Sequence, residues 1–188
     1  TLSETEYFVK DAKPKLFVTS DLNKNTGVVE LSETFQDLIV KDLQNYGDNS
    51  LPLSASRETH EFKTTFCAGD DIAAILYTSG TTGRSKGAMI SHRNLFSNAK
   101  TLSILWNISS NDILLHILPI FHTHGLFVAF NSIIYSGGSV LFHEKFMIKD
   151  VIDAIPKATM LMGVPTHYIR LTEEKSFTAK ITKNMRLF

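Results

Sequence analysis

Apolar residues along the second half of the chain fall into short runs that alternate with longer stretches of helical periodicity. Short apolar runs bounded by turn residues predict buried strands, and here they cover residues 72–77, 113–118, 140–142 and 159–164. Strands that alternate with helices of this length are typical of an α/β fold. We therefore expect a mainly parallel sheet with flanking helices.

Four helices are predicted between and after these strands. Ser91 is a capping residue, and one helical face follows it at i, i+4, i+7 and i+11, formed by Leu95, Ala99, Leu102 and Trp106. Residues 125–135 are apolar on all sides, as in a helix buried on several sides, and Gly137 ends the run. Apolar positions within 148–155 predict a third helix, and Pro165 stands where a fourth can begin.

The first seventy residues carry weaker signals. Residues 15–19 are predicted to form a short strand. Ser32 could cap a short helix whose apolar face would contain Phe35, Leu38, Ile39 and Leu43. The stretch 47–69 is polar and rich in Ser and Thr, which favours a surface loop or linker without chemistry.

Composition excludes several classes of protein. The 188 residues are 43% hydrophobic and 20% charged, and 19 basic side chains balance 19 acidic ones. These values argue against a disordered chain or a basic nucleic-acid arm. The longest apolar stretch, 113–121, is well below the roughly 20 residues of a membrane span. Because the basic and acidic side chains balance, a bound anion must be held by a local site and not by the net charge of the chain.

Cys67 is the only cysteine, so neither an intrachain disulfide nor a zinc site built on several thiolates can form. This fits a reducing compartment, and we expect a cytoplasmic protein, with a mitochondrial location as the alternative. His122 and His124 are two residues apart, a spacing also used at metal sites, but no third ligand clusters with them. We predict no metal site on this chain.

The segment after residues 72–77 carries the clearest chemistry. Five of the nine residues from Thr78 to Lys86 bear hydroxyls, two are glycines and two are cationic. Glycines let backbone N–H groups approach an anion, hydroxyls add neutral donors, and Lys86 adds charge. This composition suits a polyphosphate. The spacing is neither that of a Walker A loop nor that of a dinucleotide fingerprint.

The string from Tyr77 to Gly87 closely resembles the phosphate-binding signature of the adenylate-forming superfamily, which includes acyl-CoA synthetases, luciferases and peptide-synthetase adenylation domains. It departs once, at Ser85, where proline is common. A second string, 118–126, is similar to the family motif that supplies an aromatic or histidine side chain to the acyl pocket. The strings at 91–95 and 163–166 also match. Together they look most like malonyl-CoA synthetases, which activate malonate and in some cases methylmalonate.

The resemblance implies a role for each matching residue. Those implied to bind the β- and γ-phosphates of ATP are Thr78, Ser79, Gly80, Thr81, Thr82, Gly83 and Lys86. Two of the matching residues are implied to be catalytic: Lys86, which would steady the pyrophosphate leaving group, and His122, which falls on the gating position of the acyl pocket. The implied pocket residues are His122, His124, Met162 and Gly163. ATP, Mg²⁺ and CoA follow as the expected cofactors and substrates, with a small carboxylic acid.

Family members are more than twice as long as this chain. The Tyr-Gly-x-Thr-Glu motif, the ribose-binding aspartate and the C-terminal catalytic lysine of the family have no match here. We therefore expect residues 1–188 to be a partial N-terminal, AMP-binding domain without a C-terminal domain, and to be inactive alone. Three alternatives stay open: a general fatty acyl-CoA synthetase, a luciferase-like oxygenase and a non-catalytic phosphate-binding module.

Overall fold

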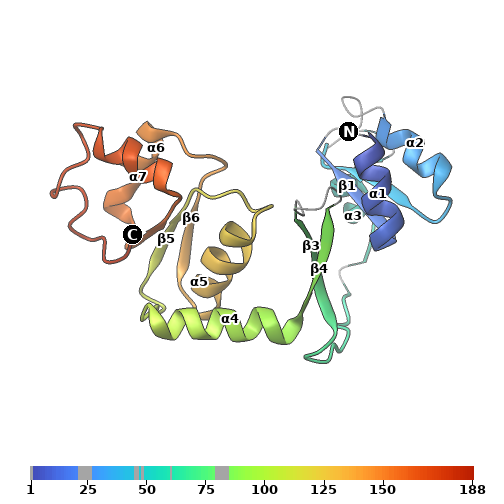
Figure 1. Ribbon diagram of the computed structural model, residues 1–188, viewed down its shortest axis with the longest axis horizontal. Coiled ribbons are helices and arrows are strands. Elements are labelled where there is room, and N and C mark those ends of the chain that lie inside the picture. The colour runs from blue at the N-terminus through green and yellow to red at the C-terminus, as the bar shows by residue number, and fades with distance from the viewer. Residues whose placement is uncertain (1, 21–26, 45–46, 48, 60, 79–84) are drawn as a thin grey trace. The chain divides into compact units, whose positions relative to one another are not determined.

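The computed structural model describes residues 2–20, 27–44, 47, 49–59, 61–78 and 85–188, with only the backbone given for 27–29. The chain forms two compact units, Thr1–Phe66 and Cys67–Phe188. Figure 1 shows the helices and strands of each unit. No helix among the described residues is long and apolar enough to cross a membrane.

The first unit contains a two-stranded parallel sheet. Its elements are α1 (Leu2–Ala12), β1 (Leu16–Thr19), α2 (Gly27–Thr34), β2 (Ile39–Asp42) and α3 (Leu51–Ser56). Strand β1 pairs with β2 in the register Leu16 to Ile39. Its buried core consists of Val9, Leu31 and Leu38.

The structure confirms the strand near residues 15–19 and corrects the neighbouring predictions. The helix expected over Phe35 to Leu43 is wrong, because α2 ends at Thr34 and residues 39–42 form strand β2. Over so short a run, the same apolar residues fit the period of a helix as well as that of a strand. The strand forms here because its backbone groups hydrogen-bond to those of β1. Within 47–69, helix α3 stands where we expected loop; Ser50 caps it, accepting a 3.1 Å hydrogen bond from the Leu53 N–H.

The second unit begins with an antiparallel hairpin, β3 (Ile72–Thr78) and β4 (Lys86–Ser91). Helix α4 (His92–Leu105) follows directly. The remaining elements are β5 (Ile113–His116), the π-helix η1 (His124–Phe130), α5 (Asn131–Tyr135), β6 (Ser139–Phe142), α6 (Ile148–Ala154), the 3₁₀ turn η2 (Ile155–Lys157), β7 (Met160–Met162) and α7 (Pro165–Thr172). The predicted strands and helices of this half are present.

Strand β4 was not predicted. Residues 86–91 looked like the end of a loop followed by a helix start, and only pairing with β3 reveals them as a strand. The cap at Ser91 is confirmed. The Asn94 N–H donates to Ser91 Oγ at 3.2 Å, and the Ser91 N–H donates to Asn94 Oδ1 at 3.0 Å. This reciprocal pair satisfies N–H groups that the first turn leaves unbonded.

A three-stranded parallel sheet in the order β6-β5-β7 forms the centre of the second unit. Consecutive residues of β5 point to opposite faces, so Leu114 belongs to the core beside η1 and α5, and Leu115 to the core beside α6 and α7. Both leucines are fully buried. A parallel sheet covered on both faces is the arrangement that near-continuous apolar strands predict.

An ion pair joins the start of this sheet to the end of the chain. The buried Asp112 carboxylate accepts two 2.6 Å hydrogen bonds from Arg186, one to each oxygen. Thr159 Oγ1 donates to the same carboxylate at 2.8 Å, as does the Ser109 N–H. The Arg186 guanidinium, and to a lesser extent Ser109 and Thr159, hold the pKa of Asp112 well below its usual range, against the opposing effect of burial.

We predict that Asp112→Asn lowers the free energy of unfolding by about 1.5–3 kcal/mol at pH 7, the typical value for hydrogen bonds to a charged group. Because the folded-state pKa of Asp112 is depressed, its contribution is fully present above the unfolded-state pKa of about 3.9 and declines as the pH falls further. Urea unfolding at several pH values, followed by the fluorescence of Trp106, measures both effects.

The control is Asp70→Asn. Asp70 also pairs with an arginine, Arg93 Nε at 2.8 Å, but both side chains are largely exposed to solvent. Exposed pairs contribute little to stability. Equal losses for the two variants would contradict a special role for the Asp112 network.

Candidate functional site

The carboxyl ends of β5 and β7 lie next to each other, because the strands are parallel neighbours. Residues 117–123 lead from β5 into η1, and residues 163–164 lead from β7 into α7. In open α/β sheets, ligands bind in the crevice outside the carboxyl ends of the strands. This edge of the sheet is therefore the place to look for a site.

Two hollows lie at this edge and share His124. One has a volume of about 250 Å³ and is lined by Trp106, His124, Met162, Gly163, Tyr168, Leu187 and Phe188. The other has a volume of about 290 Å³ and is lined by Leu118, Pro119, His122, Thr123, His124, Gly125 and Val164. The structure thus brings all four predicted pocket residues together around two adjoining spaces. Their roles in binding stay predictions.

The turn that carries the two histidines depends on Gly125. The His122 N–H donates to the Pro119 carbonyl at 3.2 Å, and the Leu126 N–H donates to the His122 carbonyl at 3.0 Å. A Cβ on Gly125 would overlap the Pro119 carbonyl oxygen and lie 2.9 Å from its carbon. Only glycine lets η1 begin this close to Pro119. His122 and His124 are both exposed, and the Phe121 ring lies 4.9 Å from that of His122.

The opposite wall comes from the end of β7. Met162 is 7% exposed and belongs both to the hydrophobic core and to the lining of the smaller hollow. A Cβ on Gly163 would lie 3.3 Å from atoms of His167 and of Tyr168, so the first turn of α7 packs closely against it. The Tyr168 hydroxyl donates to the Leu161 carbonyl at 3.3 Å. Burial raises the pKa of Tyr168.

His167 stacks on Phe146 at 4.4 Å with the rings nearly parallel. Its Nδ1 accepts a 3.5 Å contact from the Val164 N–H. Burial, followed by the charge of Arg170, lowers the pKa of His167. Sequence reasoning missed Tyr168 as a lining residue. The signal for it was Pro165, because a helix that begins there places residue 168 in its first turn, beside the end of β7.

Of the predicted phosphate-binding residues, Thr78 and Lys86 lie within the described part of the chain. They are directly opposed in the β3–β4 ladder, so their side chains share one face of the hairpin. Both are exposed. Ser79, Gly80, Thr81, Thr82 and Gly83 lie outside the described residues.

The hairpin below these two residues is closely packed. Tyr77 is opposite Gly87, and a Cβ on Gly87 would lie 3.2 Å from the Tyr77 ring and 2.8 Å from Ile75. Glycine at this position lets the aromatic ring lie across the backbone.

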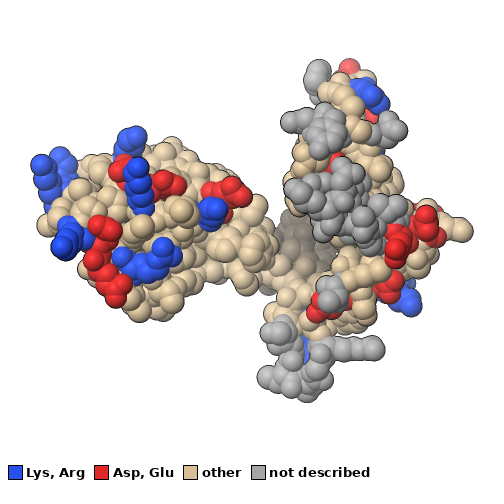
Figure 2. Space-filling model, turned by 90° about the horizontal axis from the view of Figure 1, so that it is seen from above, with Lys and Arg blue, Asp and Glu red and all other residues tan. Residues whose placement is uncertain are grey.

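The surface of the second unit carries both signs of charge. Figure 2 shows Lys and Arg interspersed with Asp and Glu over the visible face of the second unit, without a large patch of one sign. Among the described residues, no group of three or more His, Cys, Asp or Glu could hold a metal ion.

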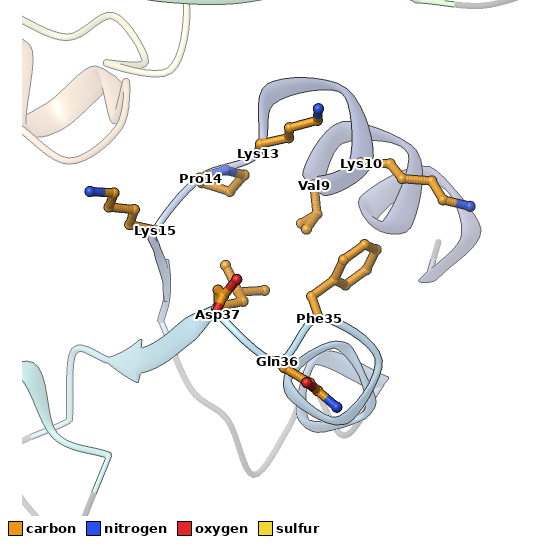
Figure 3. Close-up of a pocket in the computed structure, with 9 residues that line it drawn as sticks. Val9, Lys10, Lys13, Pro14, Lys15, Phe35, Gln36 and Asp37 are labelled. Atoms are coloured by element: carbon orange, nitrogen blue, oxygen red, sulfur yellow. The ribbon is translucent and has the colours of Figure 1, made fainter.

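A larger cavity, of about 530 Å³, lies in the first unit. Figure 3 shows Val9 and Phe35 on its apolar side and Asp37 beside them. Lys10 and Lys15 extend from its rim away from the cavity. Its lining therefore offers no convergent set of polar groups of the kind found at ligand sites.

Comparison with known proteins identifies the family. A family model described as AMP-binding enzyme matches residues 1–187. The chain belongs to the AMP-binding enzyme family. The family and the fold class predicted from the sequence are thereby confirmed.

Among solved structures, the chain is similar to apo MatB from Rhodopseudomonas palustris, with a TM-score of 0.91 and 45% identity over 100% of this chain and 37% of that chain. It is 30% identical to the mitochondrial malonate–CoA ligase of Mus musculus, over 94% of this chain and 30% of the relative. A 2-succinylbenzoate–CoA ligase of Bacillus velezensis is 40% identical over 52% of this chain and 20% of the relative. The chain thus spans about a third or less of the length of these proteins.

We predict that Gly125→Ala lowers the free energy of unfolding by about 1–3 kcal/mol, the usual cost of overpacking. The added methyl group meets the fixed Pro119 carbonyl, so the turn has to open. The matched control is Gly69→Ala, where the new methyl group would meet the exposed Arg93 side chain, which can move. Urea unfolding compares the two, and a smaller loss for Gly125→Ala than for Gly69→Ala would contradict the packing argument.

Proposed function

We propose that this chain forms the phosphate- and acyl-binding part of an ATP-dependent acid–CoA ligase whose acid is malonate or methylmalonate. The observation that carries the proposal is the meeting of His122, His124, Met162 and Gly163 at the carboxyl ends of β5 and β7. Family membership and the similarity to malonate–CoA ligases support it. So does the similarity to ATP-bound MatB, at 46% identity and a TM-score of 0.90.

In the proposed reaction, a carboxylate oxygen of the acid attacks the α-phosphorus of ATP. The bond between that phosphorus and the bridging oxygen breaks, giving an acyl-adenylate and pyrophosphate. The thiol of CoA then attacks the acyl carbon, and AMP leaves. In such a first step, the protein acts by positioning and by stabilising charge.

The phosphates are assigned to the segment that joins β3 to β4. Residues 79–83 supply backbone N–H groups and hydroxyls, and Thr78 and Lys86 stand opposite each other at its two ends. The Lys86 ammonium balances the charge that develops on the departing pyrophosphate. Mg²⁺, when bound with ATP, would neutralise phosphate charge in the same way.

The acid is assigned to the two hollows. They have volumes of about 250 and 290 Å³ and share His124. His122 and His124 can donate hydrogen bonds to the second carboxylate of malonate. A related malonyl-CoA ligase, 29% identical with a TM-score of 0.73, has methylmalonyl-CoA and AMP bound.

For the compartment, we keep the cytoplasm as the proposal. The mitochondrial malonate–CoA ligase of Mus musculus among the relatives supports the mitochondrial alternative.

We predict that Lys86→Gln, made in the full gene product that contains these residues, reduces carboxylate-dependent ATP–pyrophosphate exchange by roughly 100-fold, the scale of losing one charge-stabilising group. The control is Lys100→Gln on the exposed surface of α4, which should keep full exchange. An unchanged rate of ATP–pyrophosphate exchange in Lys86→Gln would show that Lys86 does not take part in the reaction. ATP binding without any exchange in the unmodified protein would favour the non-catalytic module.

We predict that kcat/KM for malonate exceeds that for hexanoate by at least roughly 100-fold, because donors arranged for a second carboxylate are left unpaired by a monoacid. Product analysis of CoA thioesters measures this ratio directly. Equal activity with the two acids would favour a general fatty acyl-CoA synthetase, and an oxidised product would favour a luciferase-like oxygenase.

A further inference from the structure

His116 ends strand β5 and is 1% exposed. Its ring stacks on Phe142 of β6 at 5.2 Å and meets Phe130 of η1 edge-on at 6.0 Å. The proposed function uses none of these groups. An imidazole placed among aromatic rings in the core, instead of a leucine like its neighbours in β5, needs a reason.

That reason lies in a hydrogen bond to the turn that bears the pocket histidines. His116 Nε2 lies 2.9 Å from the carbonyl oxygen of Gly125. A carbonyl only accepts, so Nε2 carries the hydrogen and donates it. Nδ1 is buried and has no hydrogen-bond partner among the described residues. Among the described residues, the hydrogen bond to Gly125 is therefore the one hydrogen bond that this ring makes.

Gly125 is fixed from two sides. The Pro119 carbonyl leaves no room for a Cβ on Gly125, and the His116 ring donates a hydrogen bond to the Gly125 carbonyl. His122 and His124 precede Gly125 by three residues and by one. A shift of Gly125 therefore moves both histidines relative to the end of β7, which forms the other wall of the hollows.

We propose that His116 is a positioning residue: by donating to the Gly125 carbonyl, it sets the start of η1 and thereby aims His122 and His124 at the acid. This inference rests on the proposed function, because the acid is the ligand that the two histidines would contact. His116 itself touches neither hollow.

The test is a matched pair of substitutions in the full gene product, His116→Gln and His116→Met. The two side chains have nearly the same length and shape, but only the glutamine amide can donate to the Gly125 carbonyl. We expect His116→Met to raise the KM for the acid by about tenfold, as for the loss of one buried hydrogen bond, with the KM for ATP unchanged. His116→Gln should stay within about threefold of the unmodified protein.

Equal acid KM values for the two variants would overturn the proposal, as would a parallel rise in the KM for ATP, which is expected of a purely structural role. If His116→Met does not fold, His116→Asn serves instead. Its shorter amide cannot reach the Gly125 carbonyl, so it should show the raised acid KM, and a normal value would equally refute the inference.

A second readout separates this inference from the proposed function. Hydrogen exchange of the amides of His122 and Leu126, whose bonds close the turn, should be faster in His116→Met than in His116→Gln. If the unmodified protein activates no acid, the proposed function fails, and this comparison still tests the positioning role. Identical hydrogen-exchange rates of these amides in the two variants would refute the positioning role.

Discussion

Strand β5 is hydrogen-bonded to a parallel strand on each side and covered by helices on both faces, and the second unit is organised around it. Leu114 and Leu115 fill the two cores, and at about 1.5–3 kcal/mol for each buried leucine they anchor both layers. Each end of the strand carries a buried polar side chain that makes a hydrogen bond or ion pair. Asp112 at one end meets Arg186, and His116 at the other meets Gly125.

The candidate acid site is a consequence of this arrangement. Parallel neighbours end at the same edge, so the chain leaves β5 and β7 at adjacent points, and both connections contribute to the lining of the larger hollow. Gly125 and Gly163 permit backbone approaches that a side chain would prevent. The exposed histidines thus stand on a turn held by buried contacts, which is how a site gains precision from a rigid scaffold.

The candidate phosphate site has a different construction. The β3–β4 ladder places Thr78 and Lys86 on one face, and the positive charge of Lys86 is local, because the chain as a whole is neutral. A polyanion assigned to this segment would be bound by short contacts from backbone N–H groups, hydroxyls and a lysine. Such contacts are less sensitive to salt than attraction by a charged surface.

The sequence alone determined the features that depend on neighbouring residues. Apolar runs identified β5 and β6, Ser91 marked the start of α4, Pro165 marked that of α7, and the string from Tyr77 to Gly87 identified the family. Tertiary structure decided the features that depend on distant partners. Residues 39–42 form a strand because they pair with the backbone of β1, and β4 is a strand because it pairs with β3. Asp112 forms its ion pair with Arg186, which is 74 residues away in the sequence. His116 has its hydrogen-bond partner only because the fold brings the Gly125 carbonyl to its side chain. Hydrogen bonds and burial join groups that are close in space, and periodicity along the chain reports only those that are also close in sequence.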